Sequence, residues 1–187
     1  SFEHRNGKIE LFNNVNVRVK KGDLIALVGP SGSGKSSFLH LLALLDTPNK
    51  GKILLNNKET KNLTDKQKDE IRRNKISIIF QENNLLTDFT VLENVMMPLI
   101  IRGEEKSSSI LKATKFLKKV KILNRINHFP NELSGGEQQR VAIARSLIAE
   151  TDLILADEPT GNLDYKTSEE IFSYFFKLKK MGKAIIF

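Results

Sequence analysis

Residues 24–45 read LIALVGPSGSGKSSFLHLLALL, and this stretch predicts the centre of the fold. Residues 24–28 form a short apolar run, which is typical of a buried strand. The residues after it fit G-x-x-x-x-G-K-[ST], a loop whose backbone N–H groups surround phosphate oxygens. These loop residues are Gly29, Pro30, Ser31, Gly32, Ser33, Gly34, Lys35 and Ser36.

The types of residue at the end of this loop indicate its chemistry. We expect Lys35 to reach the β- and γ-phosphates of a nucleoside triphosphate and the Ser36 hydroxyl to coordinate Mg²⁺. The helix that begins near Lys35 adds the positive end of its dipole. A chance turn between a strand and a helix is the alternative, but both flanking elements that the motif requires are predicted here.

Length and composition are typical of one globular domain, or of a domain with a subdomain. The chain has 187 residues, of which 40% are hydrophobic and 28% charged. Since no cysteine occurs, disulfides and thiolate metal sites are excluded, which agrees with a cytosolic setting. We expect neither a membrane span nor an export signal. The net charge of +8 suits nucleic acid or an anionic membrane surface, but the lysines are scattered, which favours solvated helix faces instead.

The remaining residues predict strands mixed with helices. Strands are expected at residues 9–12, 15–19, 52–55, 75–80, 153–156 and 184–187. Caps predict helices beginning at Thr64, Thr90, Ser134 and Thr167, and a further helix is expected over residues 110–123, after a polar loop at 102–109. Pro98 should bend or end the helix from Thr90. The predicted fold is α/β, with a phosphate-loop core sheet, an antiparallel β subdomain and a helical subdomain at about residues 82–132.

Residues 133–164 carry the second informative sequence, LSGGEQQRVAIARSLIAETDLILADEPTGNLD. Ser134 and Glu137 form a capping box, so a helix begins here with Gly135 and Gly136 in its first turn. Glycine weakens a helix but lets backbone N–H groups approach an anion closely. An ordinary capped helix that packs through its apolar side chains is the alternative, and both descriptions can hold together.

An apolar run at residues 153–156 ends in two acidic residues. A strand that delivers Asp157 beside a phosphate loop is suited to holding Mg²⁺, and Glu158 could activate a water molecule. The alternative is that both residues only cap a turn before Pro159. The phosphate-loop motif upstream favours the first interpretation.

Four motifs occur in the order GPSGSGKS, Gln81, LSGGEQQR and LILADE. This set resembles the nucleotide-binding subunits of ATP-binding cassette (ABC) transporters over nearly the whole chain, and LSGGEQQR is its specific part because generic phosphate-loop ATPases lack it. HLLALLDTPNKG, LLTDFTVLENVMMPL and LADEPTGNLD are similar to the ATPase subunits of lipoprotein-releasing systems of Gram-negative bacteria. Macrolide-exporter and cell-division ABC ATPases share much of these motif sequences.

The resemblance implies a role for each motif residue. Phe2 would stack on adenine, although an exposed Phe at a frayed terminus is the alternative, and the phosphate loop would extend to Ser37. Gln81 would contact Mg²⁺ and the attacking water, Asp157 would hold Mg²⁺, and Glu158 would be the general base. The resemblance also implies residues that act across a dimer interface. Ser134, Gly135 and Gly136 would bind the γ-phosphate of an ATP held by a second subunit, and Asp164 would cross the interface.

The resemblance also implies partners. A homodimer around two ATP molecules would drive integral membrane permease subunits from the cytoplasmic face of the inner membrane, with lipoprotein release as the implied process and residues 82–99 facing the permease. We expect part of residues 91–101 to be exposed for docking; the alternative is that all of it packs inward. No nucleic acid is expected. Alternatives are a macrolide-exporter-like or cell-division ATPase, a soluble ABC ATPase, or a role limited to ATP binding.

One position departs from the family. The family places a histidine shortly after the strand that here reads AIIF, whereas this sequence ends at Phe187. His4, His40 and His128 lie elsewhere. We therefore expect a C-terminally shortened chain that retains ATP binding but has little turnover.

Overall fold

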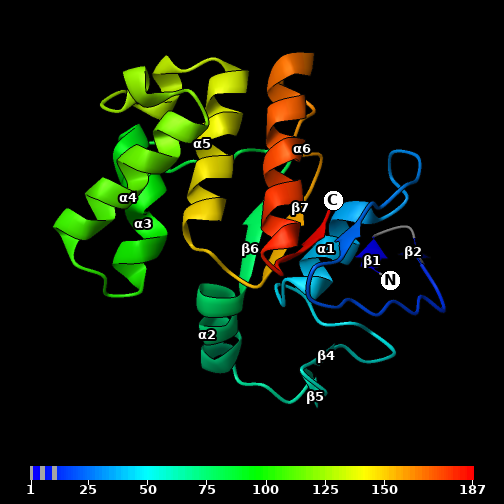
Figure 1. Cartoon of the computed structure of the whole chain (residues 1–187). Coiled ribbons are helices and arrows are strands. Elements are labelled where there is room, and N and C mark those ends of the chain that lie inside the picture. Colours follow the sequence, from blue (N-terminus) through cyan, green and yellow to red (C-terminus); the bar gives the residue numbers. More distant parts are fainter. Residues whose placement is uncertain (1, 5–6, 10–11) are drawn as a thin grey trace.

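The computed structural model describes residues 2–4, 7–9 and 12–187, with side chains from residue 12 onward. Its centre is a parallel sheet in the strand order β3-β8-β7-β6 (Figure 1). These strands are Leu24–Ile25 (β3), Ala184–Ile186 (β8), Leu153–Ala156 (β7) and Ile76–Ile79 (β6). The helices are Lys35–Leu42 (α1), Asp65–Lys75 (α2), Val91–Ile101 (α3), Lys106–Lys119 (α4), Gly135–Ile148 (α5) and Tyr165–Lys180 (α6), with 3-10 turns at Leu123–Arg125 and Pro130–Glu132. The predicted α/β class is confirmed.

Different helices cover the two faces of this sheet. Ile154 and Ile185 join the larger apolar cluster, to which α5 and α6 also contribute. Leu155 and Ile186 join a second cluster with Leu39 of α1. Successive side chains of a strand point to opposite faces, so a parallel sheet that is covered on both faces requires continuous apolar runs. This requirement explains the apolar strands of the sequence.

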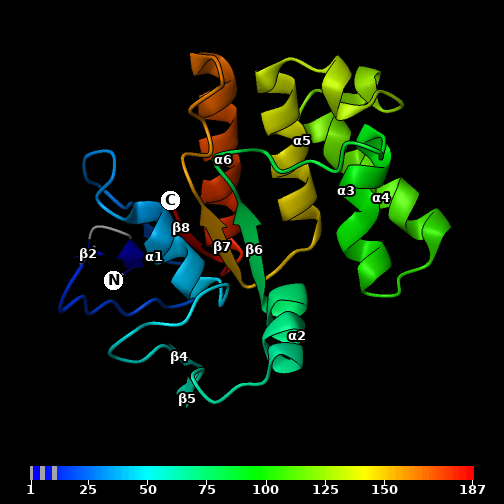
Figure 2. The ribbon, with the colours of Figure 1, turned by 180° about the vertical axis from the view of Figure 1, so that it is seen from behind.

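Residues 82–132, which we call the helical lobe, lie between β6 and β7 in the sequence and contain α3 and α4. Figures 1 and 2 both show α5 between the lobe and α6. Most of α3 packs inward: Val95 and Leu99 are buried, and the exposed apolar residues at its end are Ile100 and Ile101. Pro98 lies inside α3, which continues to Ile101, so the proline does not end the helix.

Two short antiparallel pairs accompany the sheet. Phe2–His4 (β1) pairs with Gly7–Ile9 (β2), and Leu54–Leu55 (β4) pairs with Lys58–Glu59 (β5). The second pair is the predicted hairpin. Its turn residues Asn56 and Asn57 have φ angles of 51° and 63°, the left-handed conformation that a two-residue turn requires and that Asn tolerates.

The prediction of a strand at residues 15–19 is wrong. These residues form no strand in the structure, and Val15 and Val17 remain about half exposed, at 49% and 52%. Alternation indicates a strand only where a neighbouring strand completes its hydrogen bonds. The expected strand at residues 9–12 overlaps β2 at Ile9 alone, and residues 10–11 lie outside the described part of the chain.

Three element boundaries also differ from the prediction. The strand of residues 24–28 is shorter, since β3 ends at Ile25 and Val28 is 93% exposed where the chain turns into the phosphate loop. Helix α4 begins at Lys106 within the expected loop, because the Glu105 carboxylate accepts the N–H groups of the first turn. Helix α6 is capped by Asp164, whose carboxylate accepts from the N–H of Thr167, so Thr167 is not the cap.

No helix in the described part of the chain is both long and apolar enough to cross a bilayer. The capping boxes predicted at Thr64, Thr90 and Ser134 are all present.

Candidate functional site

Most of the predicted nucleotide-binding residues follow the carboxyl ends of the parallel strands, along one edge of the sheet. All four strands are parallel, so their carboxyl ends lie along the same edge. The phosphate loop leaves this edge after β3, Gln81 follows β6, and Asp157 and Glu158 directly follow β7. In open α/β sheets this edge is where ligands bind.

The Lys35 side chain folds back over the phosphate loop. Its Nζ donates hydrogen bonds to the carbonyl oxygens of Gly29 and Pro30, at 2.9 and 3.1 Å. The loop is also tightly packed, because a Cβ at Gly29 would lie 2.8 Å from Ser33 Oγ. The Ser33 hydroxyl is itself buried and has no hydrogen-bond partner in the described part of the chain. The loop therefore holds the Lys35 ammonium against its own carbonyl oxygens and encloses the Ser33 hydroxyl.

Helix α1 begins differently from the other α-helices. Its N-cap is Gly34, with φ at 91°, and no side chain caps its first turn, whereas side chains cap the first turns of α2 to α6. The first turn of α1 also carries no acidic residue. Its N–H groups and the positive end of the helix dipole are thus left for an external anion, as in phosphate-binding loops.

Gln81 and Glu158 meet across the ends of neighbouring strands. Gln81 Nε2 donates to Glu158 Oε2 at 3.2 Å. Asp157 is only 9% exposed, and its N–H donates to the Ile79 carbonyl at 2.8 Å, which extends the pairing of β6 with β7 by one residue. The backbone of Glu158 then takes a φ of 46°, in the left-handed region. The backbone therefore leaves the strand direction directly after Asp157.

The tip of α5 is stabilised by charge. The carboxylate of Glu137 accepts hydrogen bonds from the Ser134 N–H at 2.8 Å and from Arg125 Nε at 3.0 Å. These interactions, the backbone hydrogen bond of Ser134 first, lower the pKa of Glu137 from 4.5 to about 2. The Glu137 carboxylate therefore favours the folded state only while it is ionised.

We expect this carboxylate to contribute to acid sensitivity. Because its folded pKa is depressed, its stabilisation is complete above about pH 4.5 and is lost as the pH falls towards 2. Urea unfolding across this range should show a steeper loss of unfolding free energy in the wild type than in Glu137→Gln, which keeps the capping oxygen without the charge. Equal slopes would contradict the assignment.

The two glycines of the α5 tip have different surroundings. A Cβ at Gly135 would meet nothing within 4 Å, whereas a Cβ at Gly136 would lie 3.2 Å from the Asn162 carbonyl. Gly136 thus allows the tip of α5 to pack closely on the loop after β7. Figures 1 and 2 both show α6 between α1 and α5, so this tip does not adjoin the chain's own phosphate loop.

Asp164 and Phe2 are the remaining predicted site residues. Asp164 caps α6 through Thr167, and the hydrogen bond from the Thr167 hydroxyl is the first of the interactions that lower the pKa of Asp164. The stacking predicted for Phe2 concerns a side chain outside the described part of the chain.

Sequence reasoning missed two polar residues of α5, the half-buried Arg145 and the buried Gln139. Arg145 donates to the carbonyl oxygens of Asn83 and Asn84, which closely follow Gln81, at 2.8 and 2.7 Å. Gln139 donates to the carbonyl of Pro159, next to Glu158. A polar residue on the apolar side of a helix was the available signal.

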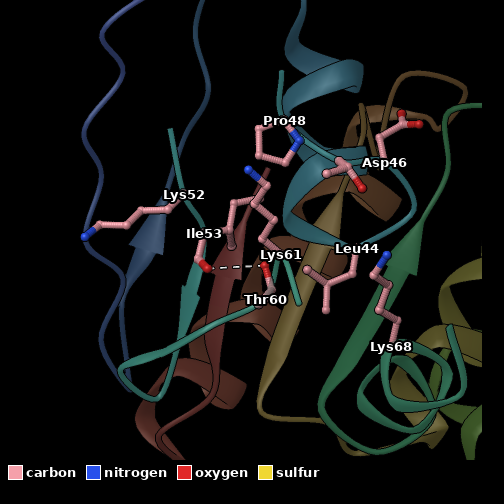
Figure 3. A pocket seen from close by; sticks show the side chains of 9 residues that line it. Leu44, Asp46, Pro48, Lys52, Ile53, Thr60, Lys61 and Lys68 are labelled. Atoms are coloured by element: carbon pink, nitrogen blue, oxygen red, sulfur yellow. Dashed lines mark hydrogen bonds between the residues drawn. The ribbon is translucent and has the colours of Figure 1, made fainter. Parts of the chain in front are cut away.

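A small cavity elsewhere lies between the end of α1, the β4–β5 hairpin and α2 (Figure 3). Leu44, Lys61 and Lys68 help to line it, and Thr60 Oγ1 donates to the Ile53 carbonyl across it at 3.2 Å. Its volume of about 10 Å³ has room for about one water molecule. The cavity is therefore not a ligand site.

Comparison with models of protein families shows which family the chain belongs to. The model of the ABC transporter family matches residues 12–161, which include the phosphate loop, Gln81, the α5 tip and Glu158. The chain belongs to the ABC transporter family. It is accordingly an ABC-type ATPase, and the predicted ABC ATPase fold is confirmed.

Individual relatives agree with this family. The chain is 47% identical over 180 residues to "Lipoprotein-releasing system ATP-binding protein LolD" of Colwellia psychrerythraea, covering 95% of this chain and 70% of that protein. It is 46% identical over 179 residues to an "Uncharacterized ABC transporter ATP-binding protein" of Thermotoga maritima, covering 96% of this chain and 76% of that protein.

Solved structures share the fold closely. The dimer of the ATP-binding cassette MJ0796 in a post-hydrolysis state, bound to ADP and phosphate, matches this ABC ATPase with a TM-score of 0.94. The two chains are 40% identical, and the match covers 99% of this chain and 82% of the other.

Proposed function

We propose that this ABC ATPase is the ATP-binding subunit of a transporter and hydrolyses ATP as a homodimer, with Glu158 as the general base. The observation that carries the proposal is the 3.2 Å contact between Gln81 and Glu158 at the edge where the phosphate loop also lies. A general base must lie within hydrogen-bonding reach of the water that it activates. In this assignment Gln81 helps to orient that water.

The residues at this edge fit ATP with Mg²⁺. The uncapped first turn of α1 and Lys35 provide donors for phosphate oxygens, and Ser33 is assigned to the same phosphates. Further phosphate contacts are assigned to Gly29, Pro30, Ser31, Gly32, Gly34, Ser36 and Ser37. Mg²⁺ is assigned to Ser36, Gln81 and Asp157, a set of oxygen donors with one carboxylate, which Mg²⁺ accepts when phosphates and water complete its shell. The ion would neutralise charge on the phosphates.

A second subunit would complete the site. The α5 tip at Ser134 and Gly135 is open to solvent and does not adjoin the chain's own phosphate loop, so it can bind the γ-phosphate of a nucleotide held by another copy. The similarity to a dimeric cassette bound to ADP and phosphate supports this arrangement. Asp164, at the start of α6, is assigned to the same interface.

Gly135→Ala tests the dimer. The added methyl group has free space in the monomer, so folding and the affinity of the monomer for ATP should be unchanged. In the dimer the methyl group would occupy space needed by the partner's phosphate, so ATP-dependent dimerisation should weaken. Sedimentation with Mg-ATP, in a background that cannot hydrolyse it, measures this effect. Dimerisation with wild-type affinity would exclude the tip of α5 from the interface.

The transport partner is assigned to an integral membrane permease. The helical lobe has exposed apolar side chains before α3, at Leu86 and Phe89, and at the end of α3, at Ile100 and Ile101, and either pair could receive an apolar segment of the permease. The similarity to LolD favours lipoprotein release from the inner membrane as the process and peripheral attachment to that membrane as the location. Lipoprotein release driven by ATP in vesicles that contain the chain and its permease would support this finer assignment, and ATP-driven export of another substrate would replace it.

A further inference from the structure

Helix α5 carries a buried amide that reaches the segment next to the proposed base. Gln139 is 1% exposed, and its Nε2 donates to the carbonyl oxygen of Pro159 at 3.1 Å. Pro159 directly follows Glu158. The contact therefore joins the helix that begins at Ser134 to the backbone of the loop that carries Glu158.

The amide oxygen of the same side chain is not satisfied by a hydrogen bond in the described part of the chain. This atom, Gln139 Oε1, is buried. A buried polar group without a partner costs about 1–3 kcal/mol, which an apolar side chain of similar length would avoid. The apolar residues Val141, Ala142 and Ile143, which follow on the helix, are all buried. Such an unmatched polar group calls for an explanation other than core packing.

The backbone of Glu158 supplies that explanation. Its φ of 46° is an unfavourable conformation for a residue with a Cβ, and conformations of this kind persist only where the surroundings hold them. One side is held by the N–H of Asp157, which donates to the Ile79 carbonyl at 2.8 Å. The other side is held at Pro159 by Gln139. Glu158 thus lies between two fixed peptide groups.

We propose that Gln139 is a positioning residue for Glu158. It holds the Pro159 carbonyl, which keeps the Glu158 backbone in its left-handed conformation and the carboxylate 3.2 Å from Gln81 Nε2. Gln139 contacts neither nucleotide nor water in this role. The inference rests on the proposed function, because it assumes that Glu158 is the base.

Replacing the amide with an apolar side chain tests the inference. In the full-length protein, Gln139→Met keeps the length of the side chain but removes the donor, so Glu158 can relax and turnover should fall by about 10- to 100-fold, the size of effect expected for a displacement near 1 Å. The Kd for ATP should stay unchanged, since the phosphate loop is untouched. Gln139→Leu, a second apolar variant, should likewise lower kcat and leave the Kd for ATP unchanged.

Gln138→Met is the matched control. Gln138 is the preceding residue of α5 and also donates to backbone carbonyls, those of Pro130 and Leu133 at 2.9 and 3.3 Å, but neither lies in the loop of Glu158. Its replacement removes equivalent hydrogen bonds from the helical lobe. A fall in kcat as large as that of Gln139→Met would show that any loosening of α5 is sufficient, and this would overturn the inference.

A double variant separates positioning from general damage. In the Glu158→Gln background, Gln139→Met should cause no further fall in single-turnover rate, because both changes act through one carboxylate. The same fractional fall in both backgrounds, or an unchanged kcat in both single Gln139 variants, overturns the inference. Wild-type turnover in Glu158→Gln alone would instead remove the proposed function.

Discussion

In a full-length version that includes the family's C-terminal segment, Glu158→Gln is expected to bind ATP as the unsubstituted protein does and to lose turnover by about 10²- to 10⁴-fold, the usual contribution of a general base. The amide is nearly the same shape as the carboxylate, so the contact with Gln81 and the turn after Asp157 should persist. What disappears is the capacity to accept a proton from water. Because binding is retained without turnover, ATP should accumulate in the complex and favour the dimer.

Phosphate release at saturating Mg-ATP measures the turnover, and equilibrium dialysis of labelled ATP measures the affinity. Glu70→Gln is the matched control, since Glu70 is exposed on α2, which leads into the amino end of β6, and it should leave both quantities unchanged. Retained turnover in Glu158→Gln would show that another group accepts the proton.

Lys35→Ala should have the second large effect, on binding itself. Truncating one partner of a charged contact costs about 2–5 kcal/mol, which corresponds to roughly a 30-fold to several-thousand-fold weaker Kd for ATP. In the structure, Lys35 Nζ donates hydrogen bonds to the Gly29 and Pro30 carbonyls, and these contacts are exposed. Their loss should therefore change the free energy of unfolding little.

Calorimetric titration with ATP and a thermal melt together check this prediction. Lys66→Ala, which removes an exposed charge from α2, controls for the change in net charge. Unchanged affinity in Lys35→Ala would remove the phosphate loop from the site. A melt that collapses would show instead that Lys35 is needed for folding.

Local sequence signals predicted the parts of this molecule that depend on neighbouring residues. The capping boxes at Thr64, Thr90 and Ser134 and the turn at Asn56-Asn57 each need only a few consecutive residues, and all are present. Apolar runs alternating with helices favour a parallel sheet whose carboxyl ends share one edge, but they do not give the strand order β3-β8-β7-β6, which depends on distant pairing.

Features that depend on distant partners could not be predicted in this way. The valines at 15 and 17 alternate as a strand would, but the structure pairs them with no strand. Gln139 contacts a carbonyl 20 residues away, and Arg145 contacts carbonyls 61 and 62 residues away. The sequence marks such residues as polar, but it does not show which backbone oxygen they reach.

The position of β3 at the edge of the sheet has a consequence for how the protein is made. In the described part of the chain β3 pairs with β8 alone, and Leu24 lies opposite Ile185, about 160 residues later. At about 5–20 residues per second, a ribosome needs roughly 10–30 s to synthesise that interval. Until then the strand that leads into the phosphate loop has no partner, and closing so long a loop is entropically costly. The nucleotide-binding loop should therefore acquire its shape only after β8 has been synthesised, and ATP cannot assist the folding steps before that point.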